Sequence, residues 1–353
     1  MKLLSRAQAI LVLTVCFALL PKSIATAHAW LPVVRLVAAA RLPGSFVSRQ
    51  VIYADSDRIF LGSFQGDLFV LRRDRKAHFP LLQTIHMESP LTGIRGDDKN
   101  VYVTSQNGIL YVFTKTWPLG PPIQSMQLSP YGLASLEVIG NNVYVAKGQA
   151  AMAASHASLY ISELNPGDSV LDVANNRTYG DVFSPDRTLA FNRASLQSVG
   201  EILNRGHGQV NIIASEDFVY LTTPGCCGLG IDVYDSNTLQ HKQFLRRTAN
   251  TVIPVNRRGF NLLVAGSEAG TMDLYILQNG LYAFLNNLDL RALTGFTGRE
   301  DIEIRTLWMD DRDDLIFAGS SWGNDHSRSA DLPSLFILEL QAKVQETTYL
   351  PAR

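Results

Sequence analysis

The chain has 353 residues, 46% of them apolar, and its basic and acidic side chains nearly balance to a formal net charge of −1. This composition is typical of a globular protein with a large core. It argues against a binder of nucleic acid or of anionic membranes, because such surfaces require clustered excess Lys and Arg.

The N-terminal segment has the features of a secretory signal peptide. Lys2 and Arg6 give a positive start, residues 9–20 are apolar, and small residues at Ala27 and Ala29 suit a cleavage site. The apolar run is too short for a comfortable membrane span. The sequence therefore predicts a signal peptide over residues 1–29 and a single domain over residues 30–353. We expect an exported protein, secreted or periplasmic, with no membrane span.

A pair of short apolar runs recurs six times along the chain. Residues 58–63 lead through Gly66 into a second run, and residues 100–105 lead through Gly108 into another. Aligned on the third residue of the first run, the six pairs have as anchors Phe60, Tyr102, Tyr144, Tyr220, Val264 and Phe317. A spacing of about forty residues between pairs of short β-runs is typical of propeller blades.

Other apolar stretches flank these pairs. Those before the pairs predict inner strands at 47–53, 91–94, 133–139, 210–214, 251–255 and 304–309. Those after them predict outer strands at 80–87, 123–128, 241–246 and 281–288. The sequence thus predicts an all-β protein, a β-propeller of six four-stranded blades, with Tyr102, Tyr144 and Tyr220 in equivalent places on second strands.

Two regions bear on the blade count and on ring closure. Residues 165–207 are read either as an extended outer strand with a short helix at 196–203, or as a seventh blade with strands at 181–183 and 188–191. Six blades are preferred because six anchored pairs are visible, and seven remain possible. Residues 31–42 form a strand-like segment that we expect to complete the final blade beside residues 335–338.

The pattern Ser-x-x-Gly-x-Leu-Tyr, clearest from Ser105 to Tyr111, resembles the repeats of pyrroloquinoline-quinone-type propellers. In that family the repeat continues with Asp, Thr-Gly and Trp, whereas Tyr111 is followed by Val-Phe-Thr-Lys-Thr-Trp without the glycine. The resemblance implies the propeller fold. The family's quinone-dependent alcohol dehydrogenases carry adjacent cysteines as a strained disulfide against the cofactor.

Cys226 and Cys227 are the cysteines that remain after removal of the signal peptide. Two lone cysteines in an oxidising compartment tend to pair, and neighbours do so through a strained ring, so we expect a Cys226–Cys227 disulfide. The pair is read either as a rigid turn or as part of a quinone site. No cofactor and no metal are predicted, because adjacent thiols cannot fill a tetrahedral set and the histidines are isolated.

Three insertions interrupt the segments between second and third strands. They are residues 149–158, the cysteine turn, and residues 322–328. The repeat geometry places them on one face of the ring, which we expect to bind a protein or small molecule. The predicted binding residues are Cys226, Cys227, Trp322, Asn324, Asp325, His326 and His156. Truncating Trp322 is expected to weaken binding more than changing Arg73, which is taken as an exposed charge.

The remaining patterns do not indicate catalysis. The acid-rich stretches 96–99 and 310–314 precede second strands in equivalent places and predict turns between strands. No Ser/His/Asp order, Gly-x-Ser-x-Gly or paired-carboxylate spacing points to catalytic residues. We therefore expect a binding or scaffolding module. The alternative is an enzyme with a site at the central channel, most concretely a quinone-dependent oxidoreductase that uses Cys226 and Cys227.

Overall fold

A computed structural model describes most of the chain. The described residues are 27–42, 51–73, 79–128, 130, 132–139, 142–148, 157–159, 168–174, 177–182, 187–192, 198–203, 211–222, 230–267, 269–294, 302–310, 312–322 and 333–347. Two compact units are present, Val34–Leu340 and a smaller one made of Met1–Val33 with Gln341–Arg353. In the smaller unit the described residues are 27–33 and 341–347, which are the ends of strands β1 and β27.

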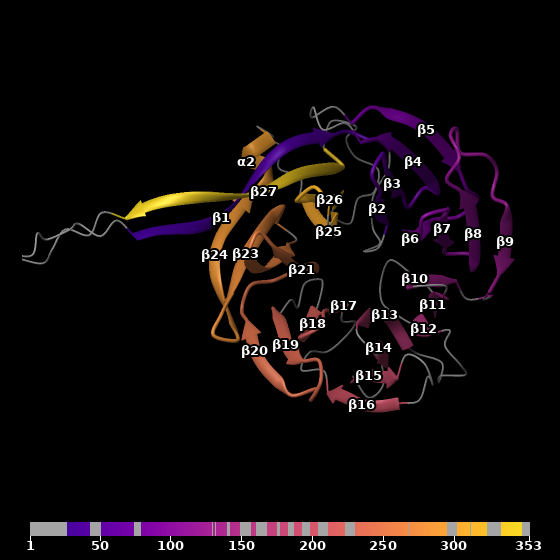
Figure 1. Cartoon of the computed structure of the whole chain (residues 1–353). Coiled ribbons are helices and arrows are strands. Elements are labelled where there is room, and N and C mark those ends of the chain that lie inside the picture. Colours follow the sequence, from indigo (N-terminus) through magenta and orange to yellow (C-terminus); the bar gives the residue numbers. More distant parts are fainter. Residues whose placement is uncertain are drawn as a thin grey trace, which may run out of the picture. The chain divides into compact units, whose positions relative to one another are not determined.

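The larger unit is a β-propeller, with seven antiparallel sheets among the described residues (Figure 1). We number its blades by chain order: blade 1 is β2–β5, blade 2 β6–β9, blade 3 β10–β12, blade 4 β13–β16, blade 5 β17–β20, blade 6 β21–β24, and blade 7 β25–β27 with β1. The first strand of each blade contacts the first strand of the next, and β25 contacts β2, so the ring closes.

The strand order within a blade is regular. The first strands are β2 (Ile52–Ala54), β6 (Leu91–Gly96), β10 (Leu133–Ile139), β13 (Asp168–Ala174), β17 (Asn211–Ala214), β21 (Thr251–Arg257) and β25 (Ile302–Asp310). The second strands are β3 (Arg58–Gly62), β7 (Asn100–Ser105), β11 (Asn142–Gly148), β14 (Arg177–Val182), β18 (Phe218–Thr222), β22 (Phe260–Gly266) and β26 (Leu315–Trp322).

The third strands are β4 (Asp67–Arg72), β8 (Ile109–Thr114), β12 (Ala157–Leu159), β15 (Arg187–Asn192), β19 (Ile231–Asp235), β23 (Thr271–Gln278) and β27 (Leu335–Thr347). The fourth strands are β5 (Leu81–His86), β9 (Gln124–Gln127), β16 (Ser198–Leu203), β20 (His241–Leu245), β24 (Leu281–Asp289) and β1 (Ala27–Ala40). A five-residue helix, α2 (Leu290–Thr294), follows β24. The predicted all-β propeller is confirmed, and Tyr102, Tyr144 and Tyr220 each stand third in a second strand, as expected.

The preferred count of six blades is wrong, because residues 168–203 form a blade of their own. Tyr179 stands third in β14, as five of the six anchors do in their strands, but Gly180 and the charged Asp181 follow it where the other pairs continue with Leu, Val or Ala and then Gly, Ala or Thr. The strand repeat was hidden by this polar continuation. The alternative of seven blades describes the fold.

The short helix expected near residues 196–203 is also absent from the described part of that range, where Ser198–Leu203 is strand β16. Its pairing with β15 skips Val199, since Ala190 pairs with Gly200 and Phe191 with Ser198. A bulge interrupts the two-residue alternation of a strand. Because of the bulge, the apolar residues Val199 and Ile202 are three positions apart in a strand, which is the spacing expected on one face of a helix.

The Ser-x-x-Gly pattern is explained by the turn between second and third strands. Gly66 and Gly108 have φ of 89° and 87°, a region that favours glycine. Their N–H groups donate to the carbonyls of Ser63 and Ser105 over 3.2 and 3.0 Å. The Ser63 carbonyl also accepts from Leu91 N–H, 3.0 Å away, which ties the turn of blade 1 to the first strand of blade 2. The pattern therefore serves the fold in these two blades.

The core lies between neighbouring blades. Phe60, Leu68 and Val70 of blade 1 pack with Val101 and Phe113 of blade 2, and all five are fully buried. Comparable clusters join blades 5 and 6, blades 6 and 7, and blades 7 and 1. The faces between blades thus supply the burial that stabilises the ring.

The ring is closed by strands from both ends of the propeller unit. In blade 7 the order is β1-β27-β26-β25, so the N-terminal strand is the fourth strand, as the sequence predicted. Ser334 N–H donates to the Ala40 carbonyl over 2.8 Å, and its hydroxyl bonds both the N–H and the carbonyl of Leu42 over 3.1 and 2.8 Å. An ion pair of 2.7 Å joins Arg35 and Glu339.

Candidate binding site between blades 2 and 3

The residues predicted from the sequence to form a binding face remain untested. Cys226, Cys227, Asn324, Asp325, His326 and His156 lie outside the described residues. Trp322 is the last residue of β26, and its backbone pairs with Ile302. In chain order the cysteine turn lies between β18 and β19, whereas residues 157–158 of the first insertion belong to β12 and Trp322 belongs to β26. The quinone hypothesis depends on the same cysteine pair and stays a prediction.

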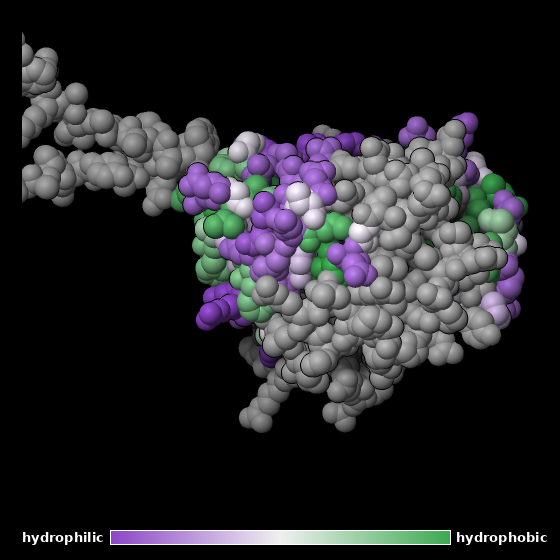
Figure 2. Space-filling model, turned by 90° about the horizontal axis from the view of Figure 1, so that it is seen from below, coloured by the Kyte–Doolittle hydropathy of each residue, from purple (hydrophilic) through white to green (hydrophobic). Residues whose placement is uncertain are grey.

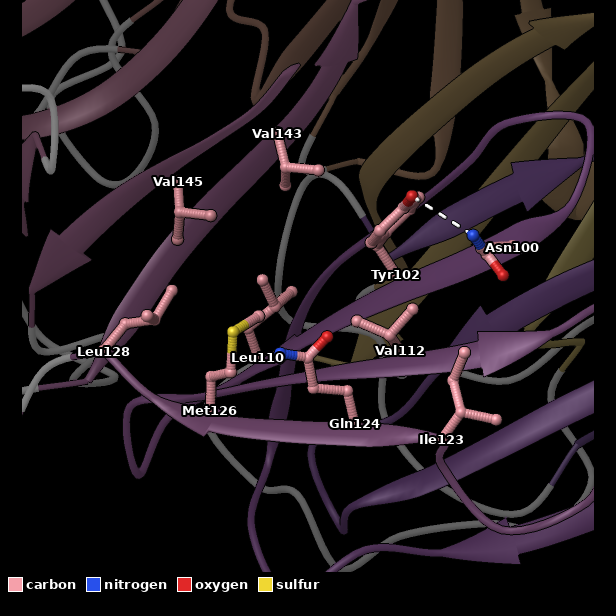
Figure 3. Close-up of a pocket in the computed structure, with 10 residues that line it drawn as sticks. All are labelled: Asn100, Tyr102, Leu110, Val112, Ile123, Gln124, Met126, Leu128, Val143 and Val145. Atoms are coloured by element: carbon pink, nitrogen blue, oxygen red, sulfur yellow. Dashed lines mark hydrogen bonds between the residues drawn. The ribbon is translucent and has the colours of Figure 1, made fainter. Parts of the chain in front are cut away.

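A groove of about 440 Å³ lies between blades 2 and 3 (Figure 3). Blade 2 supplies most of its lining, from β7, β8, β9 and the residues beside β9, and β11 of blade 3 supplies the rest. The lining residues are Asn100, Tyr102, Leu110, Val112, Ile123, Gln124, Met126, Leu128, Val143 and Val145. In Figure 2 hydrophobic surface is visible at the right edge, the side on which β8 and β9 lie in Figure 1.

Strand register explains why these side chains share one face. Tyr102 is opposite Val112, which is opposite Gln124, and this forms one row across β7, β8 and β9. Leu110 is opposite Met126 in the neighbouring row. Residues directly opposite in a sheet point to the same face, and so do residues two apart along a strand. The face toward blade 3 is therefore apolar, with the Gln124 amide at its outer margin.

Exposure distinguishes this face from its counterpart in blade 1. The corresponding row there is Phe60, Val70 and Gln83, and both apolar members are fully buried. In blade 2 Tyr102 is half-buried, and the side chain of Ile123 is 65% exposed. Leu110, Val112 and Val145 are buried in the floor of the groove, so its exposed apolar surface comes mainly from Ile123, with smaller parts from half-buried Met126, Leu128 and Val143.

The groove has a polar end built around Tyr102. Its hydroxyl donates to Asp97 Oδ2 over 2.7 Å, and Asp97 Oδ1 accepts from the N–H groups of Lys99 and Asn100, each over 2.7 Å. Burial alone raises the pKa of Asp97, but these hydrogen bonds and the charge of Lys115 outweigh it and lower the pKa. Burial and the hydrogen bond to Asp97 raise the pKa of Tyr102. At neutral pH this end presents a neutral phenol held by a carboxylate.

The acid-rich turns between first and second strands are structural, as expected. Asp97 accepts two backbone N–H groups within its own turn, and Asp55 does the same for Asp57 and Arg58 over 3.0 and 2.9 Å. Such bonds are the reason that Asp is favoured in turns. These turns hold the ends of the strand pairs in position.

Arg73 is buried, so its expected role as an exposed charge is wrong. Its guanidinium lies 3.1 Å from Asp313 of blade 7, donates to the Asp55 carbonyl over 2.5 Å, and covers the Phe317 ring at 5.6 Å. Arg73 directly follows β4, and its side chain reaches across to blade 7. Lys115, after β8, reaches Asp55 of blade 1 in the same way over 3.2 Å. Both cations therefore join a blade to the one before it.

The groove residues were not predicted as a site. One signal was available: the outer strands of blades 1, 2 and 5 share a Gln followed two residues later by an apolar residue, at Gln83, Gln124 and Gln243. Within the described residues no group of three or more His, Cys, Asp or Glu is placed to hold a metal. None of the helices in that part of the chain has the length and apolar character to cross a membrane.

Comparison with known proteins identifies the fold. No protein-family model matches the sequence, and no curated protein matches it. The WD40 β-propeller domain of Doa1 is similar in structure, with a TM-score of 0.62 and 12% identity over 87% of this chain and 97% of that one. The computationally designed Ika8 protein has a TM-score of 0.55 and 12% identity over 86% and 99%. At this identity the likeness concerns the fold alone, and the larger unit of this chain has the fold of a β-propeller.

Proposed function

We propose that this protein is a binding module that holds a partner protein in the groove between blades 2 and 3. The observation that carries the proposal is the half-buried Tyr102 together with the exposed Ile123 and Gln124, whereas Phe60 and Val70 in the corresponding row of blade 1 are fully buried. Exposed apolar surface that is bordered by polar groups is typical of interaction sites. Propeller folds commonly serve as protein-binding scaffolds, and the expected export places the partner outside the cytoplasm.

The chemistry of the groove suits recognition. Its floor is made of Leu, Val and Met side chains, while the polar groups near it are amides and a phenol. Methionine adapts its shape to different partners, and a few polar groups fix orientation. The ionised Asp97 is occupied by its own turn and by Tyr102. The raised pKa of Tyr102 keeps its phenol neutral, as suits a hydrogen-bonding group in a binding site.

A photo-crosslinking amino acid at position 123 tests the proposal in the organism that makes the protein. We expect a covalent product with a partner from position 123 and none from position 81. Leu81 is the matched control, because it lies at the outer strand of blade 1 and is 46% exposed. Met126→Glu, which puts a charge on the groove floor, should abolish the product. Equal products from positions 123 and 81, or one that survives Met126→Glu, would contradict the proposal.

A further inference from the structure

The tripeptide Gln-Asn-Gly occurs twice in the chain, at residues 106–108 and 278–280. Asparagine is a chemically labile residue, and it is most reactive before glycine. The glycine N–H is not shielded by a side chain and can attack the side-chain amide of the asparagine. Since the two tripeptides are identical, a difference in their reactivity must come from the structure around them.

The first of these turns, between β7 and β8, is held by several hydrogen bonds. Ser105 Oγ donates to Asn107 Oδ1 over 2.6 Å, and Gly108 N–H donates to the Ser105 carbonyl over 3.0 Å. Asn107 N–H donates to Ser89 Oγ over 3.0 Å, and its carbonyl accepts from Gln127 Nε2 over 2.8 Å. The two groups that would have to react, the Asn107 side chain and the Gly108 N–H, are thus already bonded.

The second turn joins β23 and β24 and is open. Asn279 and Gly280 have φ of 53° and 79°, as in a type I′ hairpin turn. Both residues are exposed, and a Cβ added to Gly280 would meet no atom within 4 Å. In the described part of the chain no hydrogen bond holds the Asn279 side chain or the Gly280 N–H. The reacting groups are therefore accessible to each other and to water.

We propose that Asn279 is a site of spontaneous deamidation. The Gly280 nitrogen forms a bond to Asn279 Cγ, and its proton passes to the side-chain nitrogen, which leaves as ammonia. The product is a cyclic succinimide, and water then opens this ring at either of its carbonyl groups. One opening gives aspartate, and the other gives isoaspartate, in which the backbone runs through the former side chain. Water is the co-reactant, and the inference is independent of the groove between blades 2 and 3.

The two products should differ in their effect on the hairpin. Aspartate before glycine suits a type I′ turn as asparagine does, whereas isoaspartate lengthens the backbone by a methylene group and no longer fits a two-residue turn. Tyr282, just beyond the turn, joins blade 6 to blade 5. Gln243 bonds both its carbonyl and its N–H over 2.7 Å each, and its hydroxyl lies 2.7 Å from that of Tyr220. Isoaspartate at position 279 should therefore loosen a contact between blades, and aspartate should not.

Peptide mapping by mass spectrometry tests the proposal on the purified protein. The folded protein is incubated in mildly alkaline buffer, and conversion at each asparagine is followed with time. We expect Asn279 to deamidate about thirtyfold faster than Asn107, because two hydrogen bonds must break before Asn107 can react. In urea, where both tripeptides are unfolded, the two rates should converge. Equal rates in the folded protein, or an Asn279 that reacts only in urea, would overturn the proposal.

Two variants separate the effect of structure from that of local sequence. Ser105→Ala removes the hydroxyl that holds Asn107 and should speed deamidation there about fivefold, with the rate at Asn279 unchanged. An unchanged rate at Asn107 would contradict the role given to its hydrogen bonds. Asn279→Asp carries one product from the start and should unfold at the same urea concentration as fresh wild type. Aged protein enriched in isoaspartate should unfold at a lower concentration, and if it matches Asn279→Asp, the effect on the contact between blades 5 and 6 is refuted.

Discussion

The interfaces on the two sides of blade 2 are built from equivalent rows but end in different states. Toward blade 1, the row of Phe60, Val70 and Gln83 is covered by Leu119, which follows β8 and crosses back to the preceding blade. Toward blade 3, the row of Tyr102, Val112 and Gln124 borders the groove, where Val112 is buried, Tyr102 is half-buried and Gln124 is exposed. The comparison shows that a blade face is buried where the next blade extends a segment across it, as the segment with Leu119 does over blade 1.

The largest difference in stability is expected between variants of the two aromatic anchors, Phe60 and Tyr102. Phe60→Ala should lower the free energy of unfolding by about 3–5 kcal/mol, because it leaves a cavity in a fully buried cluster. Tyr102→Ala should cost only about 1–2 kcal/mol, since Tyr102 is half-buried beside an existing groove. Urea unfolding measures both. Equal losses would show that the groove is filled in solution and would break the comparison.

The second largest difference in stability is expected between variants of Gln83 and Gln124. Gln83→Leu is expected to cost about 1–3 kcal/mol, because it leaves the N–H and carbonyl of buried Leu119 without partners. Gln124→Leu should change stability by less than about 0.5 kcal/mol, since the Gln124 side chain is exposed. The two variants carry the same substitution in the same row position, so each is the control of the other. A comparable loss in Gln124→Leu would mean that the Gln124 amide is hydrogen-bonded as that of Gln83 is.

The smallest expected effect is the dependence of folding stability on pH in the acid range. The pKa of Asp97 is lowered on folding from its ordinary 3.8, so its carboxylate stabilises the folded state fully above 3.8 and progressively less as the pH falls through the lowered value. Wild type should therefore be slightly more stable than Asp97→Asn at neutral pH, and the difference should shrink as the pH falls below 3.8. Thermal unfolding monitored by circular dichroism measures this. A difference in Tm that stays constant from neutral pH into this acid range would contradict the assignment.

The repeat could be read from the sequence because it is local to each blade. Six anchored pairs, their turns and the closing role of residues 31–42 all depend on neighbouring residues in one sheet. Blade 4 was missed because Gly180 and Asp181 follow Tyr179, and β16 was misread because of its bulge at Val199. In both cases one or two residues break the alternation of apolar and polar side chains that marks a strand. So short a break makes a strand look like a loop or a helix when only the sequence pattern is used.

The candidate site could not be predicted from the sequence, for a different reason. A groove between blades is defined by what the next blade contributes, and Val143 is separated from Gln124 by a whole strand and its connections. Arg73 shows the same limit, since its burial depends on Asp313 and Phe317 at the other end of the chain. The recurrence of Gln83, Gln124 and Gln243 was visible in the sequence, but its meaning required hydrogen-bond geometry.

The mixed origin of blade 7 has a consequence for how the molecule is made. Among the strands of the propeller, β1 is synthesised before all the others and its partner β27 after them. The edge of β1 therefore stays without its native neighbour until the other blades have been synthesised, and contacts of such long sequence separation form slowly. Six sheets can assemble from adjacent segments as they emerge, whereas the seventh waits for the two ends to meet. Ring completion is thus a late event, and it is the point at which a nascent chain is most exposed to pairing with another copy of itself.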